Sequence, residues 1–114
     1  MSIIRKLFIA DEGAIPLGRT QTFRCGTSNG IAYNDAGIVK AYINRCTHMG
    51  GPVELILAKQ VFRCRWHQAE FDPKTGEAIQ GEAPQGTRLT QLQTVVEEGK
   101  LYALLEIPDD PFSF

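Results

Sequence analysis

The apolar residues of the chain occur in short runs with a period close to two, and Gly, Pro or Asn interrupts these runs roughly every 8–12 residues. This alternation predicts β-strands that bury one face. Strands are expected over residues 3–9, 20–25, 31–33, 38–43, 61–65, 69–72, 89–96 and 101–107. No segment has the apolar spacing of an amphipathic helix of ordinary length, and residues 55–59 would form one helical turn at most. The pattern therefore predicts an all-β protein.

Two connections between expected strands have the chemistry of hairpin turns. Asn34-Asp35-Ala36-Gly37 joins the third and fourth strands, and Glu97-Glu98-Gly99-Lys100 joins the last two. Asn, Asp and Gly tolerate the positive φ angles that tight connections between antiparallel strands need. Asp72-Pro73-Lys74-Thr75-Gly76 is expected to form a further turn, and residues 26–30 are expected to be turn-like. These turns predict an antiparallel arrangement.

Size and composition restrict the class of protein. With 114 residues, 43% hydrophobic and 22% charged, the chain is expected to form one globular domain over residues 1–114. The 12 basic and 13 acidic residues give a net charge of -1, which provides no positive field for nucleic acid or for an anionic membrane. No apolar stretch matches a secretory signal or the roughly 20 residues that span a bilayer. A soluble, cytoplasmic protein is expected. The odd number of cysteines, three, argues against a disulfide framework.

The residues that can carry chemistry form two spaced pairs. Cys46 and His48 are two positions apart, Cys64 and His67 are three positions apart, and residues 49–63 separate the pairs. Each pair offers one thiolate and one imidazole beside an expected strand end. Two such loops, brought together by neighbouring strands, would provide four metal ligands around one compact centre.

The surrounding residues extend this pattern into a known motif. Cys46-Thr47-His48-Met49-Gly50-Gly51-Pro52 followed by Cys64-Arg65-Trp66-His67 resembles the paired motif of Rieske iron–sulfur proteins. Phe71-Asp72-Pro73-Lys74-Thr75-Gly76 resembles the turn that follows the second motif in that family. Arg65 and Gln68 depart from the family, in which Pro and Gly often stand at these positions. The resemblance implies a Rieske-like antiparallel β-sandwich with a small cluster-binding subdomain made of two loops, at about residues 44–52 and 62–72.

The resemblance also implies the cofactor, one [2Fe–2S] cluster, with Cys46, His48, Cys64 and His67 as its ligands and no catalytic residue. Two thiolates would hold one iron and two neutral imidazoles the other, which raises the potential to about -150 to +300 mV, against about -400 mV for plant-type ferredoxins. High-potential relatives have an extra cysteine in each motif, and a Ser and a Tyr hydroxyl two and four residues after the last His. This chain has no extra cysteine in either motif and has Ala69 and Phe71 at the hydroxyl positions, which implies a potential low in the Rieske range.

The function implied is that of a soluble one-electron carrier that passes electrons from a flavin-dependent reductase to a terminal oxygenase. Neither a dinucleotide fingerprint nor a second set of metal ligands is present in the sequence, so the chain is not expected to be an enzyme by itself. Two alternatives remain: the small subunit of an assimilatory nitrite reductase and a zinc-stabilised interaction module. Cys25 is expected to be a buried strand residue. The acidic side chains that follow are expected to be solvated: Glu54, Glu70, Glu77 and Glu82.

Overall fold

The computed structural model describes residues 2–25, 28–44, 53–64, 69–80 and 88–108, and all regular structure in these ranges is β-strand. The strands are β1 Ser2–Asp11, β2 Thr20–Cys25, β3 Ser28–Asp35, β4 Ile38–Ile43, β5 Val53–Ile56, β6 Val61–Cys64, β7 Glu70–Phe71, β8 Ala78–Gln80, β9 Gln91–Glu97 and β10 Lys100–Pro108. The predicted all-β class is confirmed. Within the described residues, no helix is long and apolar enough to cross a membrane.

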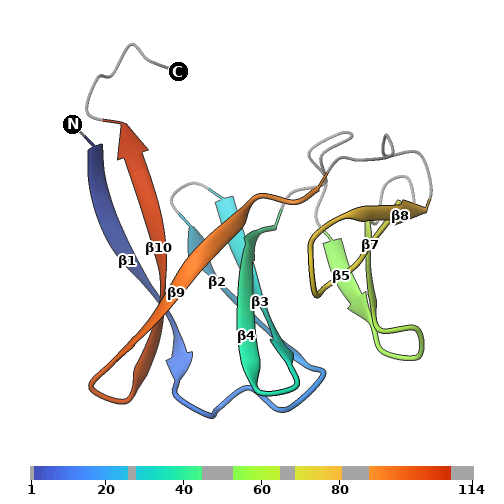
Figure 1. Cartoon of the computed structure of the whole chain (residues 1–114), viewed down its shortest axis with the longest axis horizontal. Coiled ribbons are helices and arrows are strands. Elements are labelled where there is room, and N and C mark those ends of the chain that lie inside the picture. The colour runs from blue at the N-terminus through green and yellow to red at the C-terminus, as the bar shows by residue number, and fades with distance from the viewer. Residues whose placement is uncertain (1, 26–27, 45–52, 65–68, 81–87, 109–114) are drawn as a thin grey trace.

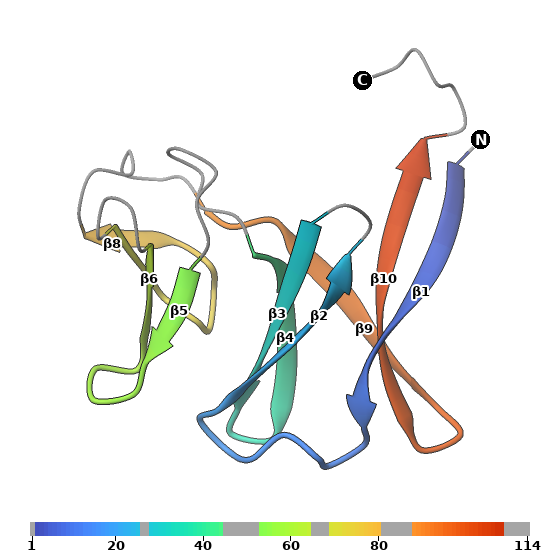
Figure 2. The same cartoon turned by 180° about the vertical axis from the view of Figure 1, so that it is seen from behind.

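The strands form two antiparallel sheets. The larger sheet has the order β1-β10-β9-β4-β3-β2, and the smaller sheet has the order β5-β6-β7-β8 (Figure 1). The larger sheet is curled. Its two edge strands, β1 and β2, therefore contact each other, although they do not pair. Figure 2 shows the same division from behind, with the smaller sheet standing beside the β3–β4 hairpin.

The smaller sheet is inserted between two neighbouring strands of the larger one. β4 and β9 pair directly, with Ala41 opposite Leu92 and Tyr42 opposite Gln91. The N–H of Ile43 donates a hydrogen bond to the carbonyl oxygen of Thr90 at 2.9 Å. The chain therefore leaves the larger sheet after β4, forms the smaller sheet and returns at the same place.

The β3–β4 hairpin separates two hydrophobic cores. Its buried side chains Ile31, Tyr33 and Tyr42 pack against the smaller sheet. Its buried alanines, Ala32 and Ala41, face the interior of the curled sheet, where the partly buried Val39 and Ile43 also pack. The core between the sheets comprises Ile31, Tyr33, Tyr42, Val53, Phe62, Cys64, Ala69, Phe71 and Leu89. The core inside the curled sheet comprises Ile9, Ile15, Phe23, Cys25, Ala32, Ala41, Leu92, Leu101 and Ala103. The hairpin contributes to both cores because side chains of a strand alternate between its faces.

Both predicted hairpins are confirmed, and each closes through two residues with positive φ. Ala36 and Gly37 have φ values of 53° and 99°, and Glu98 and Gly99 have values of 51° and 77°. Positive φ at both positions is the property of the type I′ turn, whose twist matches that of the flanking strands.

Three details differ from the sequence-based expectation. β3 begins at Ser28, inside the stretch predicted to be turn-like, because Gly30 pairs with Phe23 and the phenylalanine ring occupies the space above it. A Cβ on Gly30 would lie 2.1 Å from Cζ of Phe23. Residues 53–56 form β5 and pair with β6, so the expected helical turn over 55–59 is wrong for its first two residues. The three-residue strand β8 was not predicted.

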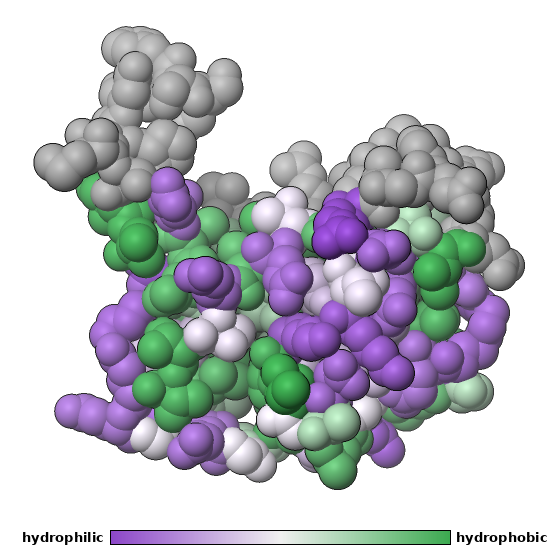
Figure 3. Space-filling view, viewed as in Figure 1, coloured by the Kyte–Doolittle hydropathy of each residue, from purple (hydrophilic) through white to green (hydrophobic). Residues whose placement is uncertain are grey.

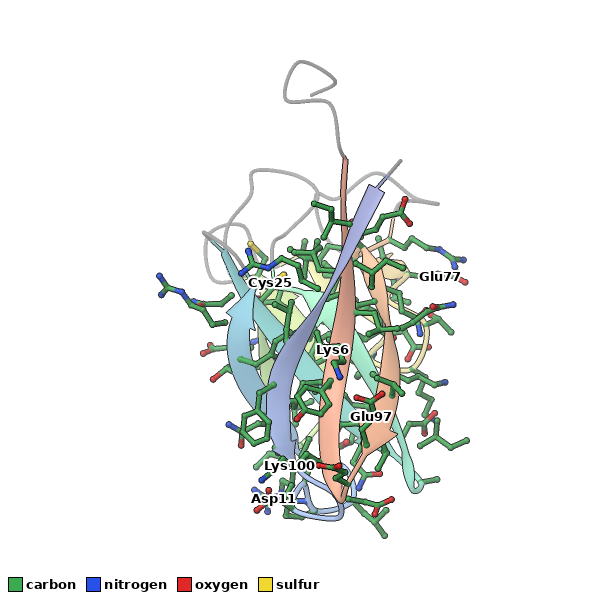
Figure 4. All side chains as sticks on the ribbon, turned by 90° about the vertical axis from the view of Figure 1, so that its left-hand side faces the viewer. Lys6, Asp11, Cys25, Glu77, Glu97 and Lys100 are labelled. Carbon is green, nitrogen blue, oxygen red and sulfur yellow. The ribbon has the colours of Figure 1, made fainter. Side chains whose placement is uncertain are left out.

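Hydrophobic and polar side chains are unevenly distributed over the surface. Figure 3 shows hydrophobic side chains gathered on the side formed by β1, β9 and β10, and hydrophilic ones toward the smaller sheet. The exposed hydrophobic residues on these three strands are Ile3, Ile4, Phe8 and Val96. On the same side, Lys6 and Glu97 form an exposed ion pair, which Figure 4 shows across β10.

Candidate metal centre

One of the four predicted ligands lies in the described part of the chain. Cys64 is the last residue of β6, and its side chain is fully buried. Cys46, His48 and His67 lie outside the described residues, so their predicted role stays a prediction. Among the described residues, no three His, Cys, Asp or Glu side chains form a group that could hold a metal ion.

The strands bring the starting points of the two predicted loops together. Val53 and Cys64 are direct partners in the β5–β6 ladder. Segment 45–52 precedes Val53 and segment 65–68 follows Cys64, so both segments depart from one end of this strand pair. The described strand ends therefore start both segments from one place, as a four-ligand centre would require.

Hydrogen bonds hold the two ends of the first segment together. The side-chain oxygen Oδ1 of Asn44 accepts a hydrogen bond from the N–H of Val53 at 2.7 Å. The N–H of Asn44 in turn donates to the carbonyl oxygen of Asn29 at 2.8 Å. Asn44 therefore ties the start of the segment both to its end and to β3.

The second segment is closed in a comparable way. The N–H of Cys64 donates a hydrogen bond to the carbonyl oxygen of Ala69 at 2.8 Å. Below this bond, Arg63 pairs with Glu70 and Phe62 pairs with Phe71 in the β6–β7 ladder. Cys64 and Ala69, which flank residues 65–68, thus end a regular antiparallel stem.

The environment of Cys64 fits an iron–thiolate bond. Its free thiol lies in the core between the two sheets, at the end of the stem of one loop and beside the end of the other. Thiolate sulfur is the ligand that Fe–S clusters use, and burial there limits the access of water. Cys25 is also free and buried, as predicted, but it belongs to the core inside the curled sheet, where burial raises the pKa of its thiol. Of the two described cysteines, only Cys64 has a position that suits a cluster ligand.

Ala69 and Phe71, which stand where high-potential relatives have hydroxyl groups, are both fully buried. Neither side chain has a hydrogen-bond donor. These two side chains therefore cannot donate a hydrogen bond to a cluster.

The sequence-based expectation for Glu70 was wrong. The residue is only 3% exposed, because Arg63 on the neighbouring strand and Lys59 from the β5–β6 turn cover its carboxylate. Glu54 and Glu77 are exposed, as expected, and Glu82 lies outside the described residues. The signal that could have identified Glu70 is its cross-strand partner, Arg63, which becomes visible only once the strand register is known.

Four short contacts surround the Glu70 carboxylate. Nζ of Lys59 lies 3.1 Å from Oε1 and 3.0 Å from Oε2. Nε and Nη2 of Arg63 donate to Oε2 at 3.1 Å and 2.7 Å. The hydrogen bonds from Arg63 and then from Lys59 lower the pKa of Glu70 below its ordinary value, and they outweigh the opposing effect of burial. The carboxylate is therefore charged, and the three side chains carry a net charge of about +1 at neutral pH.

Comparisons with known proteins agree with this arrangement. A family model described as the Rieske [2Fe-2S] domain matches residues 5–96. The cytochrome b6-f complex iron-sulfur subunit of Chlorobaculum thiosulfatiphilum is 29% identical over 94 residues, which cover 82% of this chain and 50% of that protein. The chain thus spans about half the length of this curated relative.

Solved structures share the fold. The ferredoxin of carbazole 1,9a-dioxygenase from Nocardioides aromaticivorans IC177 has a TM-score of 0.67 and 17% identity, covering 86% of this chain and 95% of that chain. A chain in a complex of reduced oxygenase and oxidized ferredoxin in carbazole 1,9a-dioxygenase has a TM-score of 0.68 and 21% identity, covering 92% of this chain and 97% of that chain. With this fold and the family match over residues 5–96, the chain belongs to the Rieske [2Fe–2S] domain family, whose cofactor is a [2Fe–2S] cluster.

Proposed function

We propose that Cys46, His48, Cys64 and His67 bind the cluster and that the chain carries single electrons from a flavin-dependent reductase to a terminal oxygenase. When bound, the cluster supplies a site that is reversibly reduced by one electron. The observation that carries the proposal is the pairing of Val53 with Cys64, which starts both ligand-bearing segments from one place. The buried thiol of Cys64 supports its role as a ligand.

The proposal of a ferredoxin rather than a subunit of a cytochrome complex has two supports. The chain matches nearly the full length of the carbazole 1,9a-dioxygenase ferredoxin and of the chain matched in the oxygenase–ferredoxin complex, but only half of the cytochrome b6-f subunit. Ala69 and Phe71 lack the hydroxyl groups of the high-potential relatives, and Cys25, the third cysteine, is committed to the other core. These residues support a potential low in the Rieske range.

The chain's own residues have structural and electrostatic roles in this proposal. The β6–β7 stem and the Asn44 hydrogen bond orient the two loops, and the core between the sheets excludes water from the Cys64 side. The reaction that consumes the electrons would take place on the oxygenase, so we propose that this chain is not itself catalytic. A carrier must bind its partners briefly, which favours a small and hydrated contact area. We further propose that residues 1–114 act as one domain and that the protein is cytoplasmic.

The first experiment tests the cofactor and its ligands. Protein reconstituted without oxygen should contain two irons and two acid-labile sulfides per chain, and the reduced form should give the low average g-value of a histidine-ligated pair in electron paramagnetic resonance. Cys64→Ser should abolish or severely alter this signal. Cys25→Ser is the matched control, because it makes the same change at the other buried cysteine, and it should retain the signal. A colourless protein that holds a single divalent metal would instead identify a zinc-stabilised module.

A second experiment tests the partners. The purified protein should be reduced by a flavin-dependent reductase and should pass the electron rapidly to a terminal oxygenase. Stable co-purification with a large sirohaem-containing subunit would contradict the free carrier and would support the nitrite reductase alternative.

A further inference from the structure

The stem of the second loop depends on a very short strand. β7 consists of Glu70 and Phe71 only, and it pairs with β6 through two residue pairs. On its other side, the register with β8 shifts between the same two residues. Because successive side chains of a strand face opposite sides, a slip of one residue would turn Phe71 out of the core and Glu70 into it. The register of β7 must therefore be specified strongly by few contacts.

The two faces of the β6–β7 pair specify this register differently. On the inner face, the fully buried rings of Phe62 and Phe71 lie in the core between the sheets. On the opposite face, Arg63 donates two hydrogen bonds to Glu70, and Lys59 reaches the same carboxylate. A slip would separate Arg63 from Glu70 and leave a charged carboxylate with fewer partners. The charged group therefore penalises the wrong register, while hydrophobic packing favours the right one.

Partly buried ion pairs of this kind add little net stability, because removing the charges from water offsets their attraction. Their better attested role is to specify one arrangement among several. Here the arrangement concerns the proposed metal centre directly. Arg63 immediately precedes Cys64, Glu70 immediately follows Ala69, and the bond between the Cys64 N–H and the Ala69 carbonyl is the next rung of the stem.

We propose that Glu70, held by Arg63 and Lys59, is a positioning residue that fixes the register of β7 on β6 and thereby the placement of Cys64 and of the loop after it, which carries His67. This role rests on the proposed ligand set. The group also carries a net positive charge close to the loop stem, which favours the reduced, more negative state of the cluster. The two effects can be separated by removing Glu70 or Arg63 alone. A positioning role predicts the same disturbance of the cluster in both variants, whereas a charge effect predicts opposite shifts of the reduction potential.

The test compares Glu70→Gln and Arg63→Gln in the cluster-loaded full-length protein. If Glu70 positions the loop, both variants should broaden or shift the electron paramagnetic resonance spectrum. Both should also release iron to a chelator about tenfold faster, which corresponds to weakening the charge-assisted hydrogen bonds to the carboxylate by about 1.4 kcal/mol. The nearby charge acts in addition: Glu70→Gln should raise the reduction potential, and Arg63→Gln should lower it. Arg63 is partly exposed, so its variant keeps the test valid if Glu70→Gln fails to fold.

Glu97→Gln is the matched control. It removes one paired carboxylate by the same substitution, but from the exposed Lys6–Glu97 pair of the larger sheet (Figure 4). Its spectrum, potential and iron release should equal those of the wild type. If the spectrum and iron release of both stem variants equal those of the control, the positioning role is refuted. If the two stem variants shift the potential in opposite directions but keep the spectrum and iron release of the wild type, the three side chains act only through their charge. The positioning role is then also refuted. If the wild type itself lacks a histidine-ligated cluster, the proposed function fails, and the positioning role fails with it.

Discussion

Tyr42 gives a prediction that can be worked out from the structure. It lies in β4, two residues before Asn44, and its ring is fully buried between the two sheets. Its hydroxyl donates a hydrogen bond to the carbonyl oxygen of Pro73 at 2.9 Å, and its ring packs edge-on against Phe62. Burial, followed by the charges of Asp72 and Asp35, raises the pKa of Tyr42 from 10.0 to about 12. The substitution Tyr42→Phe removes the hydroxyl and retains the ring.

Two effects of opposite sign follow from this substitution. Near pH 8 the variant loses one buried hydrogen bond and leaves the Pro73 carbonyl without this donor, which should cost about 1 to 2 kcal/mol of unfolding free energy. The raised pKa means that the folded protein binds the Tyr42 proton more tightly than the unfolded chain does. The resulting stability is complete below about pH 10 and is lost as the pH rises toward about 12. A shift of this size corresponds to about 3 kcal/mol, which only the wild type loses.

The two unfolding free energies should therefore cross. At about 1.4 kcal/mol per pH unit, the wild type should become the less stable protein near pH 11. Urea unfolding of both proteins, followed by circular dichroism from about pH 8 to 12, measures the difference, and effects of other titrating groups cancel in it. Ultraviolet titration of tyrosinate should also lose its most alkaline step in the variant. A difference that stays constant with pH would show that Tyr42 ionises equally easily in the folded and unfolded states, and would refute the reasoning.

Two further substitutions test the sheet itself. Ala36→Asn should raise the unfolding free energy by about 0.5 to 1 kcal/mol, because Ala36 has a φ of 53° in a two-residue turn and Asn adopts this conformation more readily; a lower melting temperature would contradict the assigned turn. Gly30→Ala should lower the unfolding free energy by about 3 kcal/mol or more, because the new Cβ would lie 2.1 Å from the Phe23 ring. Phe23→Leu in the Gly30→Ala background should recover part of this loss, and an unchanged stability of Gly30→Ala would show that the ring does not occupy this space in solution.

Much of the fold could be predicted because local chemistry determines it. The period-two pattern located the long strands, and Ala36-Gly37 and Glu98-Gly99 closed the predicted hairpins. β5 was missed because the run Val53-Glu54-Leu55-Ile56 is too short to separate a strand from a helical turn by periodicity. β8 is shorter still, and its pairing partner β7 has only two residues. Such strands exist because neighbouring strands pair with them, which a local pattern does not reveal.

The family could be predicted from the candidate ligands in the sequence, but the structural support around them could not. The spacing of the Cys and His pairs identified the family, which the match over residues 5–96 establishes. The role of Asn44 and the burial of Glu70 depend on which residues face each other across β5, β6 and β7. Glu70 looked like an ordinary solvated carboxylate because Arg63 lies seven residues away in the sequence and becomes its neighbour only through the β6–β7 register.

The insertion between β4 and β9 places the segment that carries the proposed ligands outside the strand pairing of the larger sheet. The Ile43–Thr90 hydrogen bond joins the two ends of this segment. We therefore expect that segments of different length could replace it without changing the larger sheet. A bare deletion closed by a short turn would fail, however, since Ile31, Tyr33 and Tyr42 would then meet water. Any replacement segment must therefore carry an apolar face that covers these three side chains, and this requirement limits the segments that the larger sheet can accept.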